Sequence, residues 1–180
     1  MRTDIQTAAG RYFDLLRPGD NDFGIEEIAH ALSHICRFTG HTRQHYSVAQ
    51  HSWLVSWLVP AEFALHGLLH DAAEAFVGDV SSPLKRQLPV YKVIECDIEN
   101  TVLGRFGLWG RCSPDSHRAV KQADLVALVT EQRDLMPPRG DGDWSNVDGI
   151  EPLPWTIEPL PSFMAKALFL RRFEQLGGVR

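Results

Sequence analysis

The sequence predicts an all-α fold, a compact single-domain bundle of five to seven helices. Apolar residues recur at intervals of three and four along most of the 180-residue chain, and strand patterns are weak throughout. The 44% hydrophobic and 23% charged residues are typical of a globular protein, and the length suits one domain. Because no linker divides the chain, we expect a single domain over residues 1–180.

The first three predicted helices follow one another from residue 25. The first begins with an apolar stripe from Ile25 and is expected to end at Gly40. Ser47 is placed to cap the second helix, which stops at Pro60. The third is expected to run over 61–76.

The second half of the chain predicts two further helices, at 90–106 and 116–136, and then a long loop. Residues 137–161 are rich in proline and glycine, and loops of this length are usually functional or mobile. Ser162 is expected to cap a C-terminal helix over 162–176.

Charge and cysteine content exclude several classes of protein. Lys and Arg number 18 against 23 Asp and Glu, so the net charge of −5 disfavours binding to duplex nucleic acid. No apolar run approaches the ~20 residues needed to span a bilayer, and the first ten residues lack a signal core, so we expect no membrane partner. The three cysteines have no CxxC spacing, which favours a reducing, cytoplasmic location.

The segment 67–74, Gly-Leu-Leu-His-Asp-Ala-Ala-Glu, places a polar cluster directly after an apolar approach. His70 and Asp71 diverge by about 100° on a helix, yet both can reach one ion over its flank. Glu74 follows His70 by four residues and Asp71 by three, so it shares their face. This pattern predicts a polar site whose rear lies in the core.

One His–Asp pair cannot fill a coordination sphere, and two other segments supply candidates. His51 lies in the second predicted helix, and Asp124 is the only charged residue between Gln122 and Thr130. A buried carboxylate is costly unless it is paired or binds a cation. A set of two imidazoles and two carboxylates suits a divalent Zn, Mn, Co or Fe ion, or Mg with lower affinity for histidine.

Simpler interpretations stay open for these residues. An HD dipeptide occurs by chance, a buried aspartate can cap a neighbouring helix, and a helical histidine is more often a packing residue than a ligand. Glu26, His30 and His34 form a second stripe of ligand types, which is more typical of a solvated or interface face. Trp53 and Trp57 favour packing or a subunit interface, and no cysteine has a partner at nucleophile spacing.

Six segments, in this order and wording, resemble the HD superfamily of metal-dependent phosphohydrolases. The resemblance is to its 5′-deoxynucleotidase branch and to the phage-type deoxynucleotide triphosphohydrolases, and it covers about residues 25–128. The segments are Arg37-Phe38-Thr39-Gly40-His41-Thr42, Tyr46-Ser47-Val48-Ala49-Gln50-His51-Ser52, His70-Asp71-Ala72-Ala73-Glu74-Ala75, Gly78-Asp79-Val80, Pro83-Leu84-Lys85 and Gln122-Ala123-Asp124.

The resemblance implies an HD domain whose metal-site core spans about residues 25–136. His51, His70, Asp71 and Asp124 would be the metal ligands. Glu74 would be the catalytic acid–base residue that handles the attacking water.

The resemblance also implies four substrate contacts. Arg37 and Lys85 would bind phosphate, Phe38 would lie against the nucleobase or sugar, and Asp79 would lie near the sugar hydroxyl. A second metal ion could be held near His41, Glu74 and Asp79.

The implied activity is hydrolysis of a deoxynucleoside 5′-monophosphate or triphosphate, a dATP-type triphosphohydrolase included, in a homo-oligomer. Phe38 stands where the family frequently has tryptophan, and the interval from His51 to His70 is short, which favours the compact phage-like branch. Ala75 after Glu74 argues against the alarmone hydrolases, and no GYP segment follows. A metal- and nucleotide-binding sensor without turnover is the alternative, and an all-α interaction module is the third.

Overall fold

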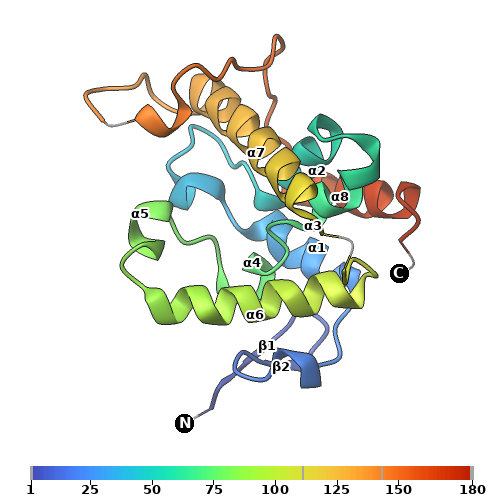
Figure 1. The fold of residues 1–180 in the computed structure, drawn as a ribbon. Coiled ribbons are helices and arrows are strands. Elements are labelled where there is room, and N and C mark those ends of the chain that lie inside the picture. Colours follow the sequence, from blue (N-terminus) through green and yellow to red (C-terminus); the bar gives the residue numbers. More distant parts are fainter. Residues whose placement is uncertain (1, 111, 143, 179–180) are drawn as a thin grey trace.

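The computed structural model describes residues 2–110, 112–142 and 144–178, and it is mostly helical (Figure 1). Within these ranges, six α-helices have six or more residues, and two more, α4 and α5, have four each. The helices are α1 (Ile25–His34), α2 (Val48–Leu58), α3 (Ala64–Leu69), α4 (Glu74–Val77), α5 (Ser82–Lys85), α6 (Pro89–Arg105), α7 (Pro114–Leu135) and α8 (Ser162–Gln175).

An N-terminal hairpin departs from the all-α prediction. Strand β1 (Asp4–Gln6) pairs antiparallel with β2 (Tyr12–Asp14). Three residues are too few for the alternation that marks a strand in a sequence. The hairpin is nevertheless part of the core, because Phe13 is 1% exposed and its ring stacks on Phe76 with centroids 3.8 Å apart.

The helix predicted over 61–76 is wrong as a continuous element. A 3-10 turn at Ala61–Phe63 precedes α3, and a second break separates α3 from α4. At that break the N–H of Ala72 donates to the Leu69 carbonyl and the N–H of Glu74 donates to the Asp71 carbonyl, a tight three-residue pattern. No glycine or proline marks this break, so tertiary packing rather than local sequence imposes it.

Two of the expected helix ends also differ. The first helix ends at His34, and Arg37–Gly40 forms a separate 3-10 turn. Ser162 is the first residue of α8 and makes no cap, because Pro161 occupies the N-cap position. The cap predicted for α2 is confirmed, since the Ser47 hydroxyl accepts from the Gln50 N–H at 3.2 Å.

Helix α2 lies at the centre of the fold and packs against α1, α3, α7 and α8. The approach of α3 is especially close. A Cβ added to Gly67 would lie 3.0 Å from the Val59 side chain and 3.3 Å from the Ser56 Cα atom. This close packing sets Gly67 of α3 against the C-terminal end of α2.

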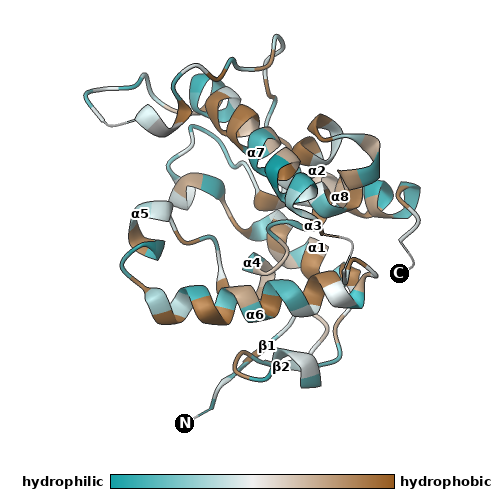
Figure 2. Ribbon diagram, viewed as in Figure 1, coloured by the Kyte–Doolittle hydropathy of each residue, from teal (hydrophilic) through white to brown (hydrophobic). Residues whose placement is uncertain are grey.

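The longest helices, α6 and α7, show alternating polar and apolar bands along their lengths (Figure 2). Such bands are expected where one face of a helix packs on the core and the other meets solvent. No helix within the described ranges combines the length and the apolar character needed to cross a membrane.

The second half of the loop between α7 and α8 is held by side chains of α2 and α7. Gln50 donates to the Glu158 carbonyl and accepts from the Leu160 N–H, both at 2.8 Å. The Leu153 N–H donates to the Thr130 hydroxyl at 3.0 Å. This part of the loop is therefore a strap fixed across two helices.

Candidate metal centre

Three elements bring three of the predicted ligands together. His51 comes from the first turn of α2, His70 from the turn after α3, and Asp124 from the middle of α7. One ligand atom from each lies within 4.8 Å of the other two. The Nε2 atom of His51 is 3.4 Å from Oδ1 of Asp124. These three residues form a candidate site for one cation.

The fourth predicted ligand, Asp71, lies at the edge of this group. Its Oδ2 atom is 3.2 Å from Nε2 of His70 and 3.6 Å from Nε2 of His51. The same oxygen is 3.7 Å from Nη1 of Arg37. Asp71 therefore faces both imidazoles and the guanidinium.

The orientation of the two imidazoles fits metal coordination. The Nδ1 atom of His70 donates to the Gly67 carbonyl at 2.9 Å, and Nδ1 of His51 is 2.6 Å from Oε1 of Glu131. Both Nε2 atoms are buried without a hydrogen-bond partner. Metal-bound histidines are usually held in this way, with one nitrogen on an acceptor and the other on the ion. Two such nitrogens beside carboxylates are a donor set that suits a divalent transition metal or zinc.

The charges around these ligands favour a cation between them. Burial lowers the pKa of His51, yet Glu131 and Asp124 raise it more, to about 9. Burial raises the pKa of Asp124, but the His51 imidazole brings it well below its usual range. The pKa of Asp71 is likewise lowered, because His70 outweighs the effect of burial. The carboxylates therefore stay ionised and attract positive charge to the centre of the group.

Glu74 is the first residue of α4 and directly follows the turn that carries His70 and Asp71. It is 5% exposed, and its Oε2 atom is buried without a hydrogen-bond partner. Burial, with Asp71 and Asp79 nearby, raises the pKa of Glu74 well above its usual range. A carboxyl group with a raised pKa can hold and release a proton near neutral pH.

The two predicted phosphate-binding cations already have carboxylate partners. Nε and Nη2 of Arg37 lie 3.1 and 3.0 Å from Oε2 of Glu131. Nζ of Lys85 lies 2.6 Å from Glu95 and 3.5 Å from Glu74. Arg37 therefore lies beside the candidate metal ligands, while Lys85 lies beside Glu74.

The two other predicted substrate residues are half-buried. Phe38 and its neighbour Thr39 have left-handed backbones, with φ of 54° and 53°, a conformation that costs about 1–3 kcal/mol per non-glycine residue. The Phe38 ring centroid is 5.7 Å from the Arg37 guanidinium carbon. Burial raises the pKa of Asp79, against the lowering effect of Arg37.

The main residue that the sequence analysis missed is Glu131, which is 0% exposed and bonds both His51 and Arg37. It lies two turns after Asp124 on α7, and this spacing is the signal that could have found it. Its neighbours Thr130 and Gln132 are also polar, so the sequence of this segment predicts a solvent-exposed helix end.

The competing clusters have local explanations. His34 Nδ1 is 2.8 Å from the His30 carbonyl, and Glu26 pairs with Lys166 at 3.2 Å. Sequence spacing gave no cysteine a nucleophile partner, and in the structure the Cys36 sulfur lies 3.1 Å from Nδ1 of His45.

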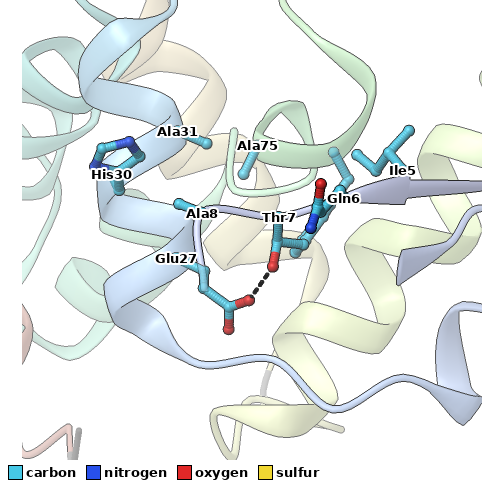
Figure 3. Close-up of a pocket in the computed structure, with 9 residues that line it drawn as sticks. Ile5, Gln6, Thr7, Ala8, Glu27, His30, Ala31 and Ala75 are labelled. Atoms are coloured by element: carbon cyan, nitrogen blue, oxygen red, sulfur yellow. Dashed lines mark hydrogen bonds between the residues drawn. The ribbon is translucent and has the colours of Figure 1, made fainter. Parts of the chain in front are cut away.

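A separate pocket of about 330 Å³ lies between β1, α1 and α4 (Figure 3). Thr7 and Glu27, which are hydrogen-bonded at 2.5 Å, lie on its wall with His30. None of the predicted site residues lines this pocket. It is therefore distinct from the candidate metal centre.

The fold and site define a mostly helical protein with a candidate His–His–Asp metal centre. The chain belongs to the family of YfdR, an uncharacterized protein of Escherichia coli K12, to which it is 41% identical over 177 residues. That match covers 98% of this chain and 97% of YfdR. It is also 36% identical to an uncharacterized protein of Rhodobacter capsulatus, over 71% of this chain and 70% of that protein. No family model matches the sequence.

Proposed function

We propose that this protein is a metal-dependent phosphohydrolase of the HD superfamily that acts on a nucleotide. The observation that carries the proposal is the convergence of two buried Nε2 atoms without hydrogen-bond partners, from His51 and His70, beside Asp124. Glu74, with its own unpartnered buried oxygen, lies in the same charge cluster. This combination of a cation site and a nearby proton carrier suits hydrolysis.

His51, His70, Asp71 and Asp124 would hold the ion, of the Zn, Co, Mn, Fe or Mg type. When bound, such an ion supplies Lewis-acid activation of water and of a phosphoryl oxygen. A second ion near His41, Glu74 and Asp79 is part of the same proposal.

The chain's own residues would move the proton and hold the anion. Glu74 takes a proton from the attacking water at its free oxygen and passes it to the leaving group, a role that typically contributes about 10²–10⁴ in rate. Arg37 and Lys85 hold phosphoryl oxygens as negative charge develops on them. The internal carboxylate partners of both cations would keep them in place before substrate arrives.

The proposed substrate is a deoxynucleoside 5′-monophosphate or triphosphate, with dATP-type triphosphohydrolysis included. Phe38 would lie against the base or sugar, and Asp79 near a sugar hydroxyl. The proposal places the protein in the cytoplasm, where free cysteines stay reduced. It also includes a homo-oligomer, for which the half-exposed Trp57 is a candidate contact beside Trp53.

The test is a screen of nucleoside mono- and triphosphates, ribo and deoxy, with each divalent ion in turn. Separating phosphate from triphosphate among the products identifies the bond that is cut. We expect turnover with at least one deoxynucleotide and its loss in Glu74→Gln. Absence of turnover by metal-loaded protein across the screen, or full activity of Glu74→Gln, would contradict the proposal.

One observation favours a second candidate, a metal- and nucleotide-binding sensor without turnover. Both predicted phosphate-binding cations are ion-paired within the chain, so an anion has to share or displace a carboxylate. A sensor would bind a nucleotide in the same screen, measured by calorimetry, and release no product.

A further inference from the structure

We propose that Glu131 is a positioning residue that fixes one metal ligand and the phosphate-binding arginine through a single carboxylate. The inference rests on the proposed metal site, and it concerns metal binding rather than turnover. The two oxygens of Glu131 have different partners. Oε1 is 2.6 Å from Nδ1 of His51, while Oε2 accepts from Nε of Arg37 and lies 3.0 Å from Nη2 of the same arginine.

The Glu131 carboxylate is fully buried, so it needs partners of this kind. Glu131 and His51 are both 0% exposed, and the Arg37 side chain is 12% exposed. A buried carboxylate without partners is strongly destabilising, and here two cationic or polar groups compensate it.

An acceptor at Nδ1 determines which nitrogen of His51 faces the ion. The carboxylate accepts the Nδ1 proton, so Nε2 is the nitrogen left to offer a lone pair to an ion. Nε2 is the atom that lies 3.4 Å from Asp124 and 3.6 Å from Asp71. Glu131 therefore directs the coordinating atom into the ligand group and prevents the ring from turning.

The second oxygen of Glu131, Oε2, holds the side chain of Arg37 in place. An isolated antiparallel bridge between Cys36 and Ser47 and the bond from the Arg37 N–H to the Tyr46 carbonyl hold the backbone of this arginine beside α2. Glu131 then fixes the guanidinium, which leaves Nη1 directed at Asp71 at 3.7 Å. A glutamine could accept from only one of these two partners, because its amide nitrogen is a donor.

The experiment compares Glu131→Gln with a matched control, Glu27→Gln. Glu27 is also a buried glutamate, 5% exposed, and accepts hydrogen bonds from an arginine, Arg11, but it lies outside the metal site. Co²⁺ affinity is measured by competition with a chelator and by the visible absorption of the bound ion. We expect Glu131→Gln to weaken Co²⁺ binding by about 10- to 100-fold, the usual effect of losing a residue behind a ligand. Glu27→Gln should bind Co²⁺ as the wild type does, although it loses stability.

A second measurement does not require the variant to fold. In zinc-loaded wild-type protein, nitrogen-15 NMR of the histidines should show a proton on Nδ1 of His51 and the metal on Nε2. Metal on Nδ1, equal Co²⁺ affinity in Glu131→Gln and wild type, or no metal binding by the wild type would each overturn the inference. A wild type that binds metal and hydrolyses no nucleotide would contradict the proposed function and leave this inference standing.

Discussion

The Nε2 atom of His51 on α2 and the Oδ1 atom of Asp124 on α7 lie 3.4 Å apart, while the other oxygen of Asp124 is held by the surface residue Lys121 at 2.9 Å. One side of this carboxylate thus faces the site and the other faces solvent. The lysine leaves the inner oxygen free to bind a cation, which makes Asp124 the candidate ligand that is most readily tested.

Asp124→Asn should lower the affinity for Zn²⁺ or Co²⁺ by more than the ~10- to 100-fold typical of residues behind a ligand, because it removes a ligating charge. Elemental analysis after dialysis and calorimetric titration measure the loss. Asp115→Asn is the control, since Asp115 lies on the same helix, is exposed and pairs with Arg118. Equal metal content in the Asp124 variant and the control would remove Asp124 from the ligand set.

Glu74→Gln should retain bound metal and lose about 10²–10⁴ in turnover, because the amide cannot exchange the proton. Metal content and product release are measured on the same sample. Glu95→Gln is the companion variant, since Glu95 also pairs with Lys85 at 2.6 Å. If both variants lost activity equally, the effect of Glu74→Gln would be assigned to the lysine rather than to proton transfer.

Gly67→Ala should destabilise the protein, because the new methyl group would lie 3.0 Å from Val59 and 3.3 Å from the Ser56 backbone. Overpacking of this kind costs about 1–3 kcal/mol, against a gain of about 1 kcal/mol in helix propensity. Urea unfolding measures the difference. Gly140→Ala is the control, since nothing lies within 4 Å of its added Cβ. A Gly67→Ala protein as stable as wild type would show that α2 and α3 can separate without cost.

His66 should make the fold less stable in mild acid. It is 3% exposed with Nδ1 3.2 Å from the Ser116 hydroxyl, and burial, with His117 and His70 nearby, lowers its pKa from 6.5 to about 4. As the pH falls from 6.5 towards 4, His66 is protonated in the unfolded chain but stays neutral in the folded chain. The free energy of unfolding therefore falls.

The measurement is urea unfolding at several pH values between 4 and 7, on wild type and His66→Gln. The variant should show a flatter pH dependence in this window, while His41→Gln, which alters an exposed histidine, should follow the wild type. An unchanged pH dependence in His66→Gln would mean that another group is responsible.

The convergence of His51, His70 and Asp124 could be predicted because each residue stands in a recognisable sequence setting. The helices that carry His51 and Asp124 were also predicted from apolar periodicity and helix-end residues, whereas His70 lies in the turn after α3 rather than in the continuous helix expected over 61–76. How His70 and Asp71 are presented could not be predicted, because the break between Leu69 and Glu74 contains no glycine or proline to mark it. The family roles of these residues remain predictions.

Glu131 was not predicted as a site residue, because the burial of its charge depends on partners that are distant in the sequence. Its two partners, His51 and Arg37, lie 80 and 94 residues away. The β1–β2 hairpin escaped for a different reason, since three-residue strands carry no periodic signal, although Phe13 is a core residue.

The strap across α2 has a consequence for engineering the chain. Gln50, the residue before His51, is hydrogen-bonded to the strap on either side of Pro159. Lengthening the segment 153–160 would therefore strain the helix that carries His51. Residues 138–142 are exposed at every position, and an insertion there would extend into solvent. A reporter peptide or an affinity label therefore belongs at that tip, where it can grow without disturbing the ligand geometry.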